Sequence, residues 1–243
     1  MKENLIIIIG GGSKGIGKSL LNCFSNKIYD KAVFHRSGEV KDSKNFAFDI
    51  DIEDSLEHVK EQLIKLIESN NYKKFSIHFL SGGGLGINFL DDNEYSFKKV
   101  LQHNLIVPTC LTSKIFNYVS ERKDKNFELF YYSSAVVNHF KASPYYVSAK
   151  SALEGMFKSS LILKPSSVKM YLIRMGIVDV EHKYFHKLYT KEKSEFKKLV
   201  LDKLPSKHFT KTDEIAQFAL KLSENENFMD GCICDISGGN SWI

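Results

Sequence analysis

The stretch "LIIIIGGGSKGIGKS", residues 5–19, places five aliphatic residues directly before five glycines that are spread over eight positions. An unbroken aliphatic run is typical of a strand buried on both faces of a parallel sheet, and a helical pattern follows it over about 16–26. Glycine permits positive φ and a close approach of the backbone to a ligand. The free N–H groups at the start of a helix attract a phosphate. The stretch therefore predicts a strand–turn–helix unit that holds a nucleotide.

The glycines of this turn can be read in two registers. These are G-x-G-x-x-G through Gly10, Gly12 and Gly15, or G-x-x-x-G-x-G through Gly11, Gly15 and Gly17. The first register commonly comes with an acidic residue about 20 positions later. Here the second expected strand ends in "VFHRS", which offers His35 and Arg36 and no carboxylate. The turn alone leaves both registers open.

Strand-like apolar runs alternate with helical patterns along the whole chain. The expected strands cover 4–10, 31–35, 46–50, 74–81, 127–134, 168–176 and 231–237. The expected helices cover about 16–26, 54–69, 95–119, 145–163 and 211–224. Seven strands separated mostly by helices predict an α/β fold, a doubly wound and mostly parallel sheet with helices on both faces. Since no Pro-rich or Ser/Gly-rich linker interrupts the pattern, we expect one domain over 1–243.

Composition restricts the possible partners and the possible location. The net charge is +5, and basic stretches carry interleaved acids, which indicates solvated helix faces and no nucleic-acid surface. The apolar runs are too short for a signal sequence or a membrane span, so we expect a cytoplasmic protein that does not bind membranes. The four cysteines lack C-x-x-C spacing, so we expect buried reduced thiols and no metal. Cys232 and Cys234, two apart, would face the same side of a strand.

The stretch "YYVSAK" carries a second chemical signal. Tyr146 and Lys150 are four residues apart, so on a helix they lie one turn apart on one face. A lysine cation near a phenol favours the phenolate, and we expect it to lower the pKa of Tyr146 from about 10. A tyrosine tuned in this way can donate or take a proton at a carbonyl or alcohol oxygen.

Further motifs stand around this pair: "LQHNL" with Asn104, "FYYSSAVV" with Ser133 and Ser134, "IRMGIVDV", and "CDISGG" near the end. With these motifs the chain resembles the short-chain dehydrogenase/reductase family, in its single-domain branch with a G-x-x-x-G-x-G turn, over nearly all of its length. The resemblance implies a Rossmann-type fold. It favours the register of Gly11, Gly15 and Gly17.

The resemblance also implies roles for individual residues. The catalytic set would be Tyr146, Lys150, Ser134 and Asn104, with Asn104 holding Lys150 through water. The cofactor would contact Gly11, Ser13, Lys14, Gly15, Ile16, Gly17, Arg36, Asp49, Ile50, Gly82, Gly83, Tyr146, Lys150, Ile177 and Val180. Strand alignment favours Ser134 as the catalytic serine, whereas the commoner spacing to the tyrosine points to Ser133.

The chain departs from the family's pattern at several positions. Gly10 stands where a Thr is usual, Ser81-Gly82-Gly83 where Asn-Ala-Gly is usual, and Met175 where a Pro is usual. Val180 replaces a Thr that often meets the nicotinamide carboxamide, which puts the orientation of the cofactor in doubt. None of these changes removes the group that transfers the proton.

We therefore expect an NADP(H)-dependent oxidoreductase that interconverts a carbonyl and a secondary alcohol. The cofactor preference rests on Arg36 and Lys14, which suit the 2′-phosphate of NADP. The partners would be a small carbonyl or alcohol substrate, covered by about 178–208, and further copies of the chain in a homodimer or homotetramer. Two alternatives remain open at this stage. They are an NAD-containing nucleotide-sugar epimerase or dehydratase, and a non-catalytic NADP sensor.

Overall fold

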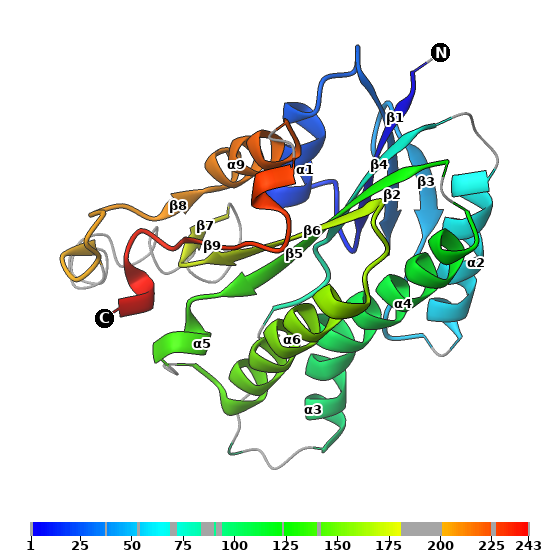
Figure 1. Cartoon of the computed structure of the whole chain (residues 1–243). Coiled ribbons are helices and arrows are strands. Elements are labelled where there is room, and N and C mark those ends of the chain that lie inside the picture. Colours follow the sequence, from blue (N-terminus) through cyan, green and yellow to red (C-terminus); the bar gives the residue numbers. More distant parts are fainter. Residues whose placement is uncertain are drawn as a thin grey trace.

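The computed structural model describes residues 2–36, 38–52, 54–68, 72–83, 90, 94–122, 124–139, 142–180, 201–224 and 227–242. Its centre is a seven-stranded sheet in the order β3-β2-β1-β4-β5-β6-β9, and every neighbouring pair is parallel (Figure 1). The strands are β1 (Asn4–Ile9), β2 (Tyr29–His35), β3 (Lys44–Ala47), β4 (Lys74–Phe79), β5 (Asn126–Ser134), β6 (Val168–Met175) and β9 (Ile233–Ile236). The α/β fold class is confirmed.

The aliphatic run of β1 lies near the middle of the sheet, between β2 and β4. Alternate side chains point to opposite faces of a strand. Leu5, Ile7 and Ile9 accordingly join one hydrophobic core, and Ile6 and Ile8 join another. Every side chain from Leu5 to Ile9 is fully buried, which is why this strand has no polar face.

Helices cover both faces of the sheet (Figure 1). One face carries α2 (Ser55–Glu68), α4 (Val107–Ser120) and α6 (Pro144–Leu163), which contribute the first core. The other face carries α1 (Gly15–Cys23) and α9 (Thr212–Glu224), which contribute the second. The described residues contain no helix long and apolar enough to cross a membrane.

The expected helix over 95–119 is divided into three parts. It consists of α3 (Glu94–Leu101), a π-helical turn (Gln102–Ile106), and α4, which begins at Val107. A π-helical turn inside a helix is rare and occurs frequently at functional sites. Thus, a local irregularity that the apolar periodicity does not predict lies around Asn104.

A short second sheet was not expected from the sequence. Strand β7 (Val178–Asp179) pairs in parallel with β8 (Thr210–Lys211), just beyond the carboxyl end of β6. The backbone N–H of Thr210 donates to the carbonyl of Ile177 at 3.1 Å. This pairing ties the two ends of the expected substrate cover together. Most of the cover, 181–200, lies outside the described residues.

Candidate active site

The glycine turn joins the carboxyl end of β1 to the start of α1. Gly10, Gly12 and Gly15 all have positive φ, at 89°, 129° and 53°. A Cβ on Gly17 would lie 2.7 Å from the backbone nitrogen of Gly12, so the helix packs directly onto the turn. The chain itself therefore requires glycine at positions from both registers.

Gly11 is the exception in this turn. Its φ is not positive, and a Cβ built on it would meet no atom within 4 Å. Neither backbone strain nor packing explains a glycine here. Open space beside the first turn of α1 is what a bound dinucleotide needs, since α1 begins at Gly15 and its Lys14 N-cap makes no side-chain capping bond. The turn therefore fits a phosphate-bearing cofactor.

The structure separates the two serines at the end of β5. The hydroxyl of Ser134 lies close enough to Tyr146, in the first turn of α6, to lower the pKa of the Tyr146 phenol. The hydroxyl of Ser133 is fully buried and donates instead to a carboxylate oxygen of Glu154 at 2.7 Å. Adjacent residues of a strand face opposite sides, so only Ser134 reaches the tyrosine.

Lys150 lies one turn after Tyr146 on α6 and is buried. Its Nζ is 5.8 Å from the centre of the Tyr146 ring and donates to the backbone carbonyl of Tyr132 at 2.7 Å. Burial lowers the pKa of Lys150 to about 8, and the negative charge of Glu154 opposes this shift. The Lys150 ammonium group is thus held beside the Tyr146 phenol, and its lowered pKa means that it can lose its proton near pH 8.

The expected lowering of the Tyr146 pKa is wrong for the protein without its ligands. Burial raises the pKa of Tyr146 above its usual value, and the hydrogen bond from Ser134 only partly offsets the rise. The physical reason is that desolvation of the phenol dominates, while the Lys150 ammonium contacts a backbone carbonyl and not the phenolic oxygen.

Asn104 connects the helix layer to the turn after β4. Its side-chain oxygen accepts from the backbone N–H of Gly83 at 3.0 Å, and its Nδ2 donates to the carbonyls of Gly83 and Val100. A Cβ on Gly82 would lie 2.6 Å from this oxygen and 3.4 Å from Nζ of Lys150. Asn104, Gly82 and Lys150 are therefore adjacent, and the π-helical turn places the amide there.

The residues expected around the adenosine lie beyond the carboxyl ends of β2 and β3. Arg36 is exposed and directly follows β2, and Lys14 and Ser13 are exposed in the glycine turn. The side chain of Asp49 accepts a hydrogen bond from the backbone N–H of Asp51 at 3.1 Å. Ile16 and Ile50 are partly buried against the two cores. These positions share one edge of the sheet with the glycine turn.

Ile177 and Val180 approach the same edge from the other side. Both are partly exposed, and Ile177 is held by the β7–β8 pairing described above. A methyl group of Val180 lies 3.1 Å from the position of a Cβ on Gly15. The segment after β6 therefore packs over the glycine turn.

A partly buried charge network behind this site was not expected from the sequence. Arg174 donates to the Glu154 carboxylate through Nε at 3.1 Å and through Nη2 at 2.7 Å. Its Nη1 lies 3.7 Å from Asp235, which also accepts from the hydroxyl of Ser241. The four-residue spacing between Lys150 and Glu154 is the signal in the sequence that could have indicated a partner for this lysine.

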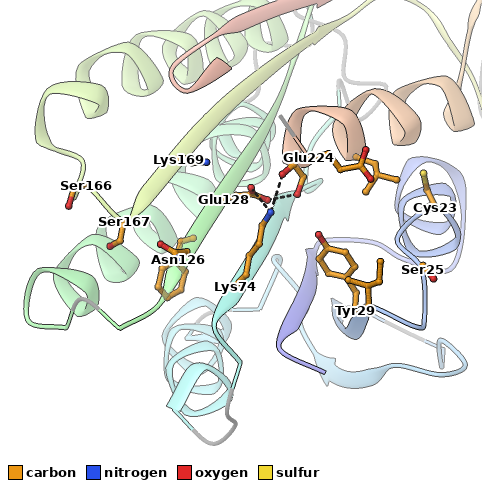
Figure 2. A pocket seen from close by; sticks show the side chains of 14 residues that line it. Cys23, Ser25, Tyr29, Lys74, Asn126, Glu128, Ser166, Ser167, Lys169 and Glu224 are labelled. Carbon is orange, nitrogen blue, oxygen red and sulfur yellow. Dashed lines mark hydrogen bonds and ion pairs between the residues drawn. The ribbon is translucent and has the colours of Figure 1, made fainter. Parts of the chain in front are cut away.

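A separate cavity of about 650 Å³ lies at the amino-terminal ends of the strands (Figure 2). The carboxylate of Glu128 is buried there, 2.9 Å from Nζ of Lys74, and it accepts a hydrogen bond from Ser223 at 2.6 Å. Burial raises the pKa of Glu128, and the Lys74 charge opposes the rise. These polar groups contact one another and lie at the edge opposite the glycine turn, so the cavity is no part of the candidate active site.

Comparison with known proteins identifies the fold. No protein-family model and no curated protein matches the sequence. Among solved structures, 4-hydroxyisoleucine dehydrogenase in complex with NADH superposes with a TM-score of 0.80 at 19% identity, over 97% of this chain and 98% of that one. A short-chain dehydrogenase family protein from Francisella tularensis gives a TM-score of 0.74 at 21% identity, over 99% of both chains.

A third similar structure is 3-ketoacyl-(acyl-carrier-protein) reductase from Brucella melitensis in complex with NADH. It gives a TM-score of 0.75 at 17% identity, over 97% of this chain and 98% of that one. The chain has the fold of the short-chain dehydrogenases/reductases, a Rossmann-type doubly wound sheet. The expected fold is confirmed.

Proposed function

We propose that this protein is an NADP(H)-dependent oxidoreductase that interconverts a carbonyl and a secondary alcohol. The observation that supports this most is that Ser134 lies beside Tyr146 and the buried Lys150, on the same sheet edge as the glycine turn. Ligands of open α/β sheets bind at the carboxyl ends of the strands. The position of Tyr146, Lys150 and the glycine turn at this edge therefore supports the proposal.

The roles follow from the chemistry of these groups. A nicotinamide dinucleotide supplies or accepts the hydride when it is bound. Tyr146 donates a proton to the carbonyl oxygen in reduction and takes it back in oxidation. Ser134 orients that oxygen through its hydroxyl, and the Lys150 ammonium stabilises the phenolate that remains. Asn104 keeps the Gly82–Gly83 backbone against Lys150 through its hydrogen bonds to Gly83.

The preference for NADP(H) rests on charge. The 2′-phosphate that distinguishes NADP from NAD needs cations and tolerates no nearby carboxylate. Arg36 and Lys14 are exposed cations at the two segments expected to border the ribose. Within the part of the chain that the structure describes, neither side chain takes part in an ion pair. Two of the similar structures hold NADH, so this preference separates the protein from them.

The experiment that tests the activity is Tyr146→Phe, with Tyr145→Phe as the matched control. Tyr145 is the neighbouring tyrosine, and its ring stacks on Phe97 with centroids 4.8 Å apart. With a panel of carbonyl substrates and NADPH, Tyr146→Phe should lower turnover by about two to four decades. Tyr145→Phe should retain most of the activity. Equal turnover in the two variants would remove Tyr146 from the mechanism.

We also propose that the chain associates with itself. The apolar residues of α6 that could form such a contact are mostly covered within the fold. Leu153 and Phe157 of α6 are buried in the core, and Met156 and Leu161 pack against it, so these four do not form a free face. Ile162 and Leu163 at the end of α6 remain 87% and 76% exposed. That the chain forms a homodimer or homotetramer stays a prediction, which light scattering tests. A cytoplasmic location also stays a prediction.

A further inference from the structure

Cys232 and Cys234 form a close pair of thiols on the last strand of the sheet. Their Sγ atoms are 3.3 Å apart, and both residues are half-buried. The expectation that these cysteines are buried is therefore wrong, because among the described residues β9 is an edge strand that pairs with β6 on one side only. The pair lies apart from the glycine turn and from Tyr146, and the proposed reaction does not use it.

The surroundings make the two thiols unequal. The two thiols share one hydrogen bond in which either sulfur can be the donor, and this contact lowers the pKa of Cys234 below its usual value. The same hydrogen bond, burial and the nearby Asp230 carboxylate raise the pKa of Cys232. A thiolate is the nucleophilic form of cysteine, and a neighbouring protonated thiol can resolve its oxidised product. The 3.3 Å separation of the two sulfurs places a resolving thiol within reach of an oxidised partner, and the direction of the pKa shifts favours Cys234 as the attacking sulfur.

We propose that Cys232 and Cys234 are a redox-active dithiol site that reacts with hydrogen peroxide and closes to a disulfide. The Cys234 thiolate attacks a peroxide oxygen, the O–O bond breaks, and water leaves after protonation. This forms a sulfenic acid on Cys234. The Cys232 sulfur then attacks that sulfur, the S–S bond forms, the S–O bond breaks, and a second water leaves. The two sulfurs supply the two electrons that reduce the peroxide, and an external thiol restores both.

Strand geometry makes this disulfide reversible. Residues two apart on a strand have Cα atoms about 6.6 Å apart, close to the upper limit for a disulfide. The bond therefore forms with strain, and strained disulfides are more easily reduced than structural ones. Cys232 directly precedes β9, and its carbonyl accepts from the backbone N–H of Leu172 at 3.0 Å, so it continues the pairing of β9 with β6.

The test uses a variant that keeps only the pair, Cys23→Ser with Cys110→Ser. Treated with hydrogen peroxide and then unfolded, it should lose both free thiols, and its intact monomer mass should fall by two hydrogen atoms. Dithiothreitol should restore the thiols and the mass. The matched control is Cys232→Ser with Cys234→Ser, which keeps Cys23 and Cys110 and should keep both thiols under the same treatment.

Single variants identify the attacking sulfur. Cys232→Ser should accumulate a sulfenic acid on Cys234 that dimedone traps. Cys234→Ser should react with peroxide at least about tenfold more slowly, because the remaining thiol is mostly protonated at neutral pH. The proposal is overturned if the pair variant keeps its thiols, if it forms only disulfides between chains, or if Cys23 and Cys110 are oxidised at the same rate as the pair. Light scattering and circular dichroism establish that each variant is folded.

Discussion

Glu154 accepts a hydrogen bond from the Ser133 hydroxyl at 2.7 Å, and this contact turns the first of two adjacent serines away from Tyr146. The same carboxylate receives two hydrogen bonds from Arg174 and lies one helical turn after Lys150. Glu154 thus connects the strand below the candidate site to the helix that carries its tyrosine and lysine. We interpret it as a positioning residue, because its carboxylate contacts Ser133 and Arg174 within the fold.

The first prediction concerns Glu154→Gln. The substitution removes one of the two charges that pair with Arg174; losing a buried ion pair costs up to about 3–5 kcal/mol, and the remaining Asp235 carboxylate offsets part of this cost. We expect the free energy of unfolding in urea to fall by up to this amount. The control is Glu57→Gln, which breaks an exposed pair with Lys60 and should cost under about 1 kcal/mol. Equal stability of the two variants would show that the buried pair is not a net stabilising contact.

The second prediction concerns the open glycine. In Gly11→Ala the new methyl meets no atom of the described residues within 4 Å, so the free energy of unfolding should stay within about 0.5 kcal/mol of the wild type. The affinity for the dinucleotide should fall by at least about tenfold, a loss of about 1.4 kcal/mol, because the methyl occupies the space proposed for the cofactor. Calorimetric titration measures the affinity and urea unfolding measures the stability.

Two further substitutions control this experiment. Gly155→Ala adds a methyl that also meets no neighbour, on α6, and should leave cofactor affinity unchanged. Gly17→Ala should destabilise the fold, since its methyl would lie 2.7 Å from a backbone nitrogen. Undiminished cofactor affinity in Gly11→Ala would exclude Gly11 from the binding site and favour the other register.

The third prediction concerns cofactor choice. Each charged contact to the 2′-phosphate should contribute about 1.5–3 kcal/mol before solvent screening, so Arg36→Ala should weaken NADPH binding by about 10- to 150-fold and leave NADH unchanged. Lys41→Ala, which removes an exposed cation from the same connection, should affect neither. Fluorescence titration of both cofactors decides the matter. If the wild type binds NADH as tightly as NADPH, or if Arg36→Ala keeps its preference, the assignment to NADP(H) is incorrect.

The fourth prediction follows from the lowered pKa of Lys150. Its pKa is about 8 in the folded protein and about 10.5 in the unfolded chain, so below pH 8 folding must bury a charged lysine. Between pH 8 and 10.5 the unfolded chain binds more protons, and this group makes stability rise with pH. Replacing it by methionine should therefore increase stability most below pH 8, by up to about 3 kcal/mol, and less as pH approaches 10.5.

The measurement for this prediction is urea unfolding of wild type and Lys150→Met at several pH values from 7 to 10.5. Tyrosines and cysteines far from Lys150 titrate alike in both proteins and cancel in the difference, and Tyr146→Phe in both proteins removes the neighbouring phenol, which does not cancel. A constant difference in unfolding free energy across the range would mean that the lysine is not buried as a cation.

The order of the elements follows from the sequence because it rests on local periodicity. The aliphatic run over 5–9 can only be buried on both faces, and the alternation with amphipathic helices then requires a parallel sheet with two covered faces. The glycine turn and the four-residue spacing of Tyr146 and Lys150 are likewise local patterns. The boundaries of α1, α2 and α6 accordingly lie within a few residues of the expected ones.

The sequence could not decide features that depend on contacts between distant segments. His78 looks like any strand residue. In the fold it is fully buried, its Nδ1 lies 2.8 Å from the Tyr132 hydroxyl, and burial lowers its pKa to about 3. The π-helical turn at Asn104 also depends on a distant segment. The Asn104 amide contacts the carbonyl and the N–H of Gly83, 21 residues away.

The choice between Ser133 and Ser134 separates what the sequence determines from what only the tertiary structure determines. The sequence by itself determined that two hydroxyls end a strand some twelve residues before a tyrosine on a helix. Only the tertiary structure decided which of the two hydroxyls faces Tyr146. Ser133 points to the face of the sheet where Glu154 accepts its hydrogen bond and Arg174 binds the same carboxylate, so Ser134 points to Tyr146. A strand alternates its faces at every residue, and the packing of distant elements selects which face each one meets.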